Sequence, residues 1–190
     1  MMVGCAAVHR VWSRGFTVSE LIGTIGFVTI LGALAMYGVA RYLKHSKTVE
    51  AVGNTTAIAQ AACVYYNQSD ANQPAGTKPD AAKAMRHFPP SSRASVPANP
   101  GDVTGKRFQS SIGDWSTSPW REMSFKISTP QYYTYSFESE GSGQASRSTA
   151  VAHGDLDGNG VTSTFRVTAA PDEAFVAKAS AKVDEVEPDE

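Results

Sequence analysis

One short loop in the C-terminal third of the chain has the residue types and spacing of a calcium ligand set. Asp155, Asp157 and Asn159 alternate with other residues, and Gly160 stands sixth from Asp155. This pattern matches the first half of an EF-hand loop, in which alternate oxygen ligands and a glycine in sixth place wrap a calcium ion. The second half does not match, because Arg166 occupies the twelfth position, where a bidentate glutamate belongs. The same residues are also typical of a tight hairpin turn that needs no ion, and the sequence leaves both interpretations open.

No other residue pattern predicts catalysis or a cofactor. None of the histidines stands in a metal-binding or nucleophile signature such as His-Glu-x-x-His or Gly-x-Ser-x-Gly (His9, His45, His87 and His153). Calcium prefers oxygen ligands, so His153 beside the acidic loop is a poor candidate ligand. Cys63 falls on the expected buried face of a helix, where a small apolar core residue is the simpler interpretation. We therefore expect no enzymatic activity.

A single carboxylate stands at the start of the most apolar stretch of the chain. Residues 21–40 carry no charge, and a helix of this length, at about 1.5 Å per residue, spans the roughly 30 Å hydrocarbon core of a bilayer. Glu20 immediately precedes this run, and a carboxylate costs about 2.5–3.5 kcal/mol at the centre of a membrane helix and less near its end. One local partner is the backbone, because Thr17 and Glu20 have the spacing of a capping box at a helix N-terminus.

The residues before the apolar run resemble a known processing signal. Arg14-Gly15-Phe16-Thr17, followed by Glu20 and a long apolar run, is similar to the class III leader of type IV prepilins and type II secretion pseudopilins. Cleavage of such a leader falls before the apolar segment and leaves it in the product, whereas an ordinary signal peptide loses that segment. Glycine at the junction would let the chain enter a protease site in extended form at little steric cost.

The resemblance implies a processing step and an assembly role. A prepilin peptidase would cut after Gly15 and methylate the new amine of Phe16. Glu20 would then pair with the Phe16 amine of a neighbouring subunit in a filament. The chain would be a structural subunit of a type IV pilus-like filament. It would be minor pilin-like, because two features that many pilins carry are missing. The helix lacks a central proline, and the rest of the chain lacks a cysteine pair.

The resemblance also implies partners and a location. The partners would be the prepilin peptidase, identical or homologous pilin subunits, the inner membrane and the assembly machinery. The prepilin would lie in the bacterial inner membrane with its N-terminus cytoplasmic and its head periplasmic, and would then move to the cell surface in a pilus or to a periplasmic pseudopilus. The net charge of −1 gives no sign of a nucleic-acid partner.

Three alternatives stay open at the level of the sequence. The same leader serves the pseudopilins of type II secretion systems. Ala33-Leu34-Ala35 resembles a signal-peptidase site, which would release a secreted protein beginning at Met36. The apolar run would also serve as a plain single-pass anchor for a periplasmic binding module or enzyme.

The chain is expected to have five parts. Residues 1–15 form the leader, 16–40 the transmembrane and assembly helix, 41–68 an amphipathic half of the same helix, 69–170 a globular head, and 171–190 an acidic, flexible tail. The amphipathic half rests on one stripe of residues spaced three or four apart: Val49, Val52, Thr56, Ala59, Cys63 and Tyr66.

Strands dominate the second half of the expected head. Residues 69–105 are rich in proline and polar residues, which predicts loops with one short helix at 79–87. Alternating apolar residues predict strands near 123–127 and 133–137, and a second hairpin formed by 149–153 and 161–168. A long helix followed by about four antiparallel strands is an α+β layout. The resemblance implies that it is pilin-like, with a long N-terminal membrane-spanning helix packed on a small antiparallel sheet.

Overall fold

The computed structural model describes residues 15–68 and 79–188, so the predicted leader, apart from Gly15, lies outside the described residues. The chain divides into two compact units, Met1–Arg41 and Tyr42–Glu190. Helix α1 spans Val18–Gln68 and α2 spans Pro79–Met85. The strands are β1 (Thr134–Glu140), β2 (Arg147–Gly154), β3 (Ser163–Pro171), β4 (Ala177–Ala179) and β5 (Asp184–Val186), with short 3-10 turns at Pro100–Asp102, Ile112–Trp115 and Gly143–Ala145.

Helix α1 begins at the capping box that the sequence predicts. The backbone N–H of Glu20 donates to the Thr17 hydroxyl at 3.3 Å, and the Thr17 N–H donates to Glu20 Oε2 at 2.8 Å. These bonds satisfy amides that have no partner inside the helix. The first part of α1, residues 18–41, is called here the apolar segment; it contains a stretch long and apolar enough to cross a membrane, none of it buried. The remainder, residues 42–68, is called the packed segment.

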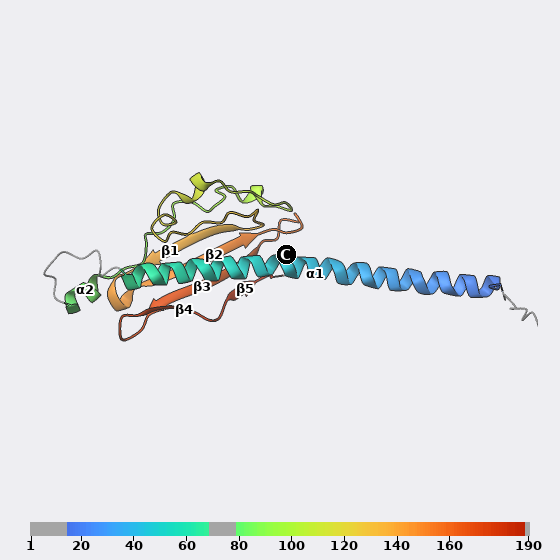
Figure 1. Ribbon diagram of the computed structural model, residues 1–190, viewed down its shortest axis with the longest axis horizontal. Helices are drawn as coiled ribbons and strands as arrows, with labels where there is room; N and C mark the ends of the chain where they lie inside the picture. The colour runs from blue at the N-terminus through green and yellow to red at the C-terminus, as the bar shows by residue number, and fades with distance from the viewer. Residues whose placement is uncertain (1–14, 69–78, 189–190) are drawn as a thin grey trace, which may run out of the picture. The chain divides into compact units, whose positions relative to one another are not determined.

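The packed segment lies on an antiparallel sheet in the second unit (Figure 1). Its buried stripe differs by one position from the predicted one over its first half, since Val49 is exposed and the neighbouring Thr48 is buried. Most of the buried residues are small: Thr48, Ala51, Thr55, Ile58, Ala59, Ala62, Cys63 and Tyr66. Small side chains let the helix approach the sheet closely, so Val49 is exposed while Val52 packs at the edge of the core.

The sheet has the order β1-β2-β3-β4, and β5 also pairs with β3. All of these pairs are antiparallel. The register places Phe137 beside Ala150 and Ala150 beside Val167, so that small residues of the central strand lie between larger ones. These residues are buried in one core with the packed segment. A long N-terminal apolar helix packed on a small antiparallel sheet is the α+β layout that the sequence predicts.

The packed segment is also fixed to the sheet unit by polar contacts. Asn54 Nδ2 donates to the Tyr135 hydroxyl at 2.8 Å, and the Tyr66 hydroxyl donates to the carbonyl of Gly143 at 2.9 Å. The side chain of Asn67 both accepts from the N–H and donates to the C=O of Ala177 at 2.9 and 3.2 Å. Apolar packing between small residues would let the helix slide along the sheet at little cost. These hydrogen bonds fix the position of the packed segment along its own axis relative to the sheet.

The prediction of a strand at residues 123–127 is wrong. This segment turns instead, with Met123 N–H donating to the Pro119 carbonyl at 3.0 Å and Phe125 N–H to the Trp120 carbonyl at 2.9 Å. Phe125 packs against Trp115 and Trp120, with ring centroids 5.6 and 6.2 Å away. The alternation of apolar residues therefore reflects a compact aromatic cluster, in which Met123 and Ile127 are buried and Phe125 is half-buried without any strand partner.

The C-terminal residues also differ from the flexible acidic tail that composition predicts. Strands β4 and β5 pair with β3, which satisfies their backbone groups. Asp172 Oδ1 accepts the N–H groups of Ala174 and Val176, and a second contact joins the Thr48 hydroxyl to the Pro188 carbonyl at 3.0 Å. The acidic charge stays at the surface, partly offset by Lys178 at 2.9 Å from Asp172. The acidic composition did not predict that β4 and β5 pair with β3, because this pairing depends on backbone hydrogen bonds and not on side-chain charge.

Candidate functional site

The two residues of the predicted cleavage junction are accessible. Phe16 is 82% exposed, and no atom lies within 4 Å of the position that a side chain on Gly15 would occupy. Helix α1 begins only at Val18, so the junction has no helical hydrogen bonds to break. An uncovered peptide bond outside regular secondary structure is accessible to a protease.

Glu20 uses one of its two carboxylate oxygens to cap its own helix. Oε2 accepts from the backbone N–H and from the hydroxyl of Thr17, both at 2.8 Å. Within the described residues, Oε1 accepts no hydrogen bond. The capping role predicted from the sequence is confirmed, whereas the pairing of Glu20 with a neighbouring Phe16 stays a prediction.

The apolar segment exposes large side chains all around its surface. They include Leu21, Ile22, Ile25, Phe27, Val28, Ile30, Leu31, Leu34, Met36, Tyr37 and Val39. Each 100 Å² of such surface left in water forgoes about 2.5 kcal/mol of transfer free energy. Within the described residues nothing buries this surface, and an apolar surface of this length suits a lipid bilayer or contact with other helices.

The glycines of the apolar segment mark places where another helix can approach. No atom lies within 4 Å of a side chain built on Gly23, Gly26, Gly32 or Gly38. In a water-soluble helix each would cost up to about 1 kcal/mol relative to alanine. In membranes, small residues allow close backbone contact between helices and are enriched at their interfaces.

The acidic loop uses its side-chain oxygens to build a turn. Asp155 accepts from the N–H groups of Gly158 and Gly160 at 2.7 and 3.0 Å. Asp157 Oδ1 accepts from Asn159 N–H at 3.2 Å, and its Oδ2 lies 3.0 Å from Lys44 Nζ in the packed segment. Across residues 15–68 and 79–188, no group of three or more histidine, cysteine or acidic side chains could hold a metal ion.

Side-chain oxygens that accept backbone N–H groups in this way are what the hairpin-turn interpretation of the loop predicts. Asn159 Oδ1 likewise accepts from Val161 N–H at 2.6 Å, so all three candidate ligands hold backbone amides. Calcium at Asp155, Asp157 and Asn159 stays a prediction, and binding would require these oxygens to exchange amides for the ion. His153 points elsewhere, with Nδ1 2.8 Å from the Thr164 hydroxyl. Burial lowers the pKa of His153, and the nearby Arg166 adds to this effect.

The packed segment contains one partly buried acid. Glu50 Oε1 accepts the backbone N–H of Tyr132 at 3.0 Å. Burial raises the pKa of Glu50, while the hydrogen bond from Tyr132 and the charge of Arg107 act in the opposite direction. Lys47 and Arg107 both lie over the Tyr132 ring, at 4.6 and 4.8 Å from its centroid.

Cys63 has the structural role that the sequence predicts. It is a free, buried cysteine in the core between helix and sheet. Burial raises the pKa of its thiol to about 11. Because the thiolate is the reactive form, this thiol is protonated and unreactive at neutral pH.

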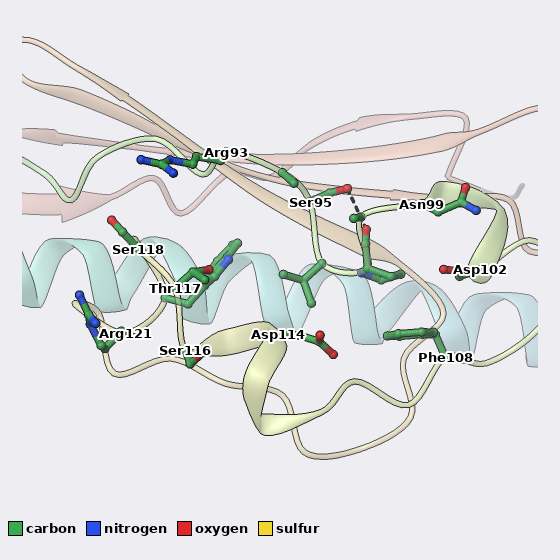
Figure 2. Close-up of a pocket in the computed structure, with 15 residues that line it drawn as sticks. Arg93, Ser95, Asn99, Asp102, Phe108, Asp114, Ser116, Thr117, Ser118 and Arg121 are labelled. Atoms are coloured by element: carbon green, nitrogen blue, oxygen red, sulfur yellow. Dashed lines mark hydrogen bonds between the residues drawn. The ribbon is translucent and has the colours of Figure 1, made fainter.

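A pocket of about 700 Å³ in the second unit has no counterpart in the sequence predictions (Figure 2). It lies between residues 93–102 and the segment from Phe108 to Arg121, both of them largely irregular. Val96 and Trp120 are buried at its wall, and Arg93, Asp102, Asp114 and Arg121 also line it. No motif marks these residues in the sequence, because the pocket depends on how two distant loops pack together.

Comparison with protein families, with characterised proteins and with solved structures finds no match to this chain. Any functional interpretation therefore depends on the features of this chain alone. The described features that a function could use are the uncovered apolar segment, the capped carboxylate at its start and the pocket. The pocket falls in the range of about 300–1,000 Å³ that is usual for small-ligand sites.

Proposed function

We propose that this chain is a structural, minor pilin-like subunit of a type IV pilus-like filament, assembled through α1 after a prepilin peptidase cleaves behind Gly15. The observation that carries the proposal is the contrast within one helix. The packed segment buries its face in the chain's own core, whereas the apolar segment leaves a bilayer-length surface uncovered. Such a surface suits a segment that leaves the lipid only to pack against copies of itself.

The residues at the start of α1 favour a role in filament assembly over a role as a membrane anchor alone. Cleavage behind Gly15 creates a positive amine on Phe16, four residues before the carboxylate of Glu20. Glu20 Oε2 is engaged by Thr17, and Oε1 is the oxygen that would receive the Phe16 amine of a neighbour. A charged pair between subunits would satisfy both groups in an apolar bundle, where an unpaired charge is costly.

The competing starts of the mature chain fit less well. Met36 lies inside α1, which continues from Val18 to Gln68, so a cut before it would divide a continuous helix. A plain anchor would need neither a carboxylate at the edge of the span nor the glycines at positions 23, 26, 32 and 38, which weaken a helix.

The test of processing is the mass of the mature N-terminus. The chain is produced in cells with a prepilin peptidase and its N-terminal peptide is analysed by mass spectrometry. We expect a sequence that starts at N-methylated Phe16, and a Gly15→Leu variant that keeps Met1. A wild-type chain that retains Met1, or that starts at Met36, would contradict the proposal.

A second experiment separates pairing from capping at Glu20. Glutamine can replace glutamate in a capping box, so Glu20→Gln keeps the acceptor for Thr17 and removes only the charge. We expect Glu20→Gln to be processed and inserted normally but depleted from sheared filaments, whereas the same exchange at Glu50 leaves incorporation unchanged. Normal incorporation of Glu20→Gln would remove the pairing role while leaving processing intact.

A further inference from the structure

The turn between β2 and β3 uses one carboxylate to hold two glycine amides (Figure 1). Asp155 Oδ1 accepts the N–H of Gly158 at 2.7 Å, and Asp155 Oδ2 accepts the N–H of Gly160 at 3.0 Å. Both glycines have positive φ, of 78° and 88°, a conformation that other residues rarely adopt. The carboxylate of Asp155 is therefore a fixed proton acceptor for the backbone nitrogens of two residues.

The residue before each glycine folds its side chain forward along the backbone. Asp157 Oδ1 accepts the N–H of Asn159 at 3.2 Å, and Asn159 Oδ1 accepts the N–H of Val161 at 2.6 Å. Such a bond draws the side-chain carbonyl over the residue's own next peptide unit. Asp157-Gly158 and Asn159-Gly160 are therefore two copies of one local arrangement, which differ in whether the side chain ends in a carboxylate or an amide.

An asparagine before a glycine can react with its own backbone, and asparagine is among the chemically labile residues of proteins. The nitrogen of Gly160 attacks Cγ of Asn159 and forms a new N–C bond, which closes a five-membered succinimide ring. The Cγ–Nδ2 bond breaks, and ammonia leaves with the proton that the Gly160 nitrogen gives up. Water then opens one of the two ring carbonyls, which leaves aspartate or isoaspartate at position 159.

The turn supplies the groups that this ring closure needs. Asp155 Oδ2 lies within the hydrogen-bond reach, about 2.6–3.2 Å, that a general base requires of the proton it removes. The N–H of Val161 already donates to Asn159 Oδ1, the oxygen on which negative charge develops during the attack. No atom lies within 4 Å of the place that a side chain on Gly160 would occupy. Asn159 and Gly160 are exposed, so water reaches the ring.

From this arrangement we infer that Asn159 is a site of spontaneous deamidation, assisted by the carboxylate of Asp155 and the N–H of Val161. The modified turn gains a negative charge beside Asp155 and Asp157. Isoaspartate also adds one methylene to the backbone, which displaces the bond to Val161. A chain that has existed for long thus differs in charge from a new one. The site is independent of the proposed filament role, because all of its residues belong to the second unit.

The other asparagines of the described chain do not meet these conditions. Asn54 and Asn67 lie in α1, and their side chains are held by hydrogen bonds to Tyr135 and Ala177. Asn99 precedes a proline, whose nitrogen carries no proton to lose. Asp157 has the matching geometry, but a carboxylate ion resists attack by a nucleophile.

Peptide mapping by mass spectrometry tests the inference on the full chain, kept folded in detergent micelles at mildly alkaline pH for several weeks. A sample digested at the start corrects for conversion during preparation. We expect the amide-to-acid mass change to accumulate at Asn159, with aspartate and isoaspartate separated by chromatography, and not at Asn54, Asn67 or Asn99. Conversion should be at least as fast as in the same chain unfolded in urea, because only the native turn supplies the base and the donor.

A variant that repeats the arrangement tests the geometry. Asp157→Asn places a second amide before a glycine whose N–H is held by Asp155, so the new asparagine should convert at a rate similar to that of Asn159. Asp155→Asn should slow conversion at Asn159 at least about tenfold, because the general base is lost. An Asn159 that stays intact in the folded chain, or that converts faster in urea, would overturn the inference. That comparison uses the unaltered protein, so it decides the question even where a variant disturbs the turn.

Discussion

The two parts of α1 share one helix and meet opposite surroundings. The apolar segment carries large aliphatic side chains that nothing in the described chain covers, while the packed segment buries mostly alanine and threonine. Much of the core in the second unit comes from Tyr135, Phe137 and Phe165 of the sheet and from Tyr133 just before β1. Residue size distinguishes the two environments better than hydrophobicity does. Small residues mark the face that meets a sheet of large residues, and large residues mark the segment that the described chain leaves uncovered.

A charge placed in the middle of the apolar segment should have the largest effect. Leu31→Arg puts a guanidinium near the centre of the span, which costs about 2.5–3.5 kcal/mol. We expect the variant to be lost from the membrane fraction after carbonate extraction, with about a hundredfold lower insertion.

The matched change in the packed segment is Val64→Arg, because Val64 is an exposed aliphatic residue of the same helix. It should remain in the membrane and alter the free energy of unfolding by less than about 0.5 kcal/mol. Equal membrane retention of the two variants would contradict the assignment of the apolar segment to the bilayer.

Overfilling the helix–sheet interface should have an intermediate effect. Ala62 is fully buried, so Ala62→Leu forces helix and sheet apart and should destabilise the second unit by about 1–3 kcal/mol. Urea unfolding followed by tryptophan fluorescence measures this, since Trp115 and Trp120 lie in the same core.

Ala57 provides the control, because it is exposed on the same helix and leucine is also a strong helix former. Ala57→Leu should leave the urea midpoint nearly unchanged. If both leucine variants were equally stable, the packed segment would not lie against the sheet as closely as described.

The smallest effect concerns the buried acid of the packed segment. The pKa of Glu50 is raised in the folded state above its ordinary 4.5, so the folded state binds more protons than the unfolded state just above that pH. Stability due to this group is therefore present below pH 4.5 and falls as the pH rises through the raised pKa. Glu50→Gln removes this loss and keeps an acceptor for Tyr132.

The measurement is the urea midpoint of both proteins from acidic to neutral pH. The two curves should coincide at low pH, and the variant should become progressively more stable than the wild type as the pH rises. A variant that lost stability at neutral pH would show that the charge of Glu50 contributes favourably, through Arg107.

The parts of the fold that follow from local pattern could be predicted from the sequence. The length of α1, its cap at Thr17 and Glu20, and strands β1 to β3 depend on periodicity and on residues close in the chain. The segment near Phe125 could not be predicted, because an aromatic cluster buries alternate residues just as a strand does. The C-terminal strands were missed for a different reason: their pairing with β3 is a long-range backbone interaction to which an acidic composition gives no clue.

The candidate site divides in the same way. Gly15, Phe16 and Glu20 stand close together in sequence, and a local motif is enough to indicate them. The pocket brings Arg93 together with Arg121 from loops that no motif connects, so only a three-dimensional arrangement reveals it. The acidic loop lies between these cases, since its turn was predictable while its contact with Lys44 was not.

The burial of Cys63 has a practical consequence for measuring how often the packed segment separates from the sheet. Residues 16–190 contain no other cysteine, so processing behind Gly15 would leave a molecule with one native labelling position. A thiol reagent added under native conditions can react only when the helix lifts away from the sheet. The rate of labelling therefore reports how often that opening occurs, in the membrane or in an assembled fibre, without an introduced probe.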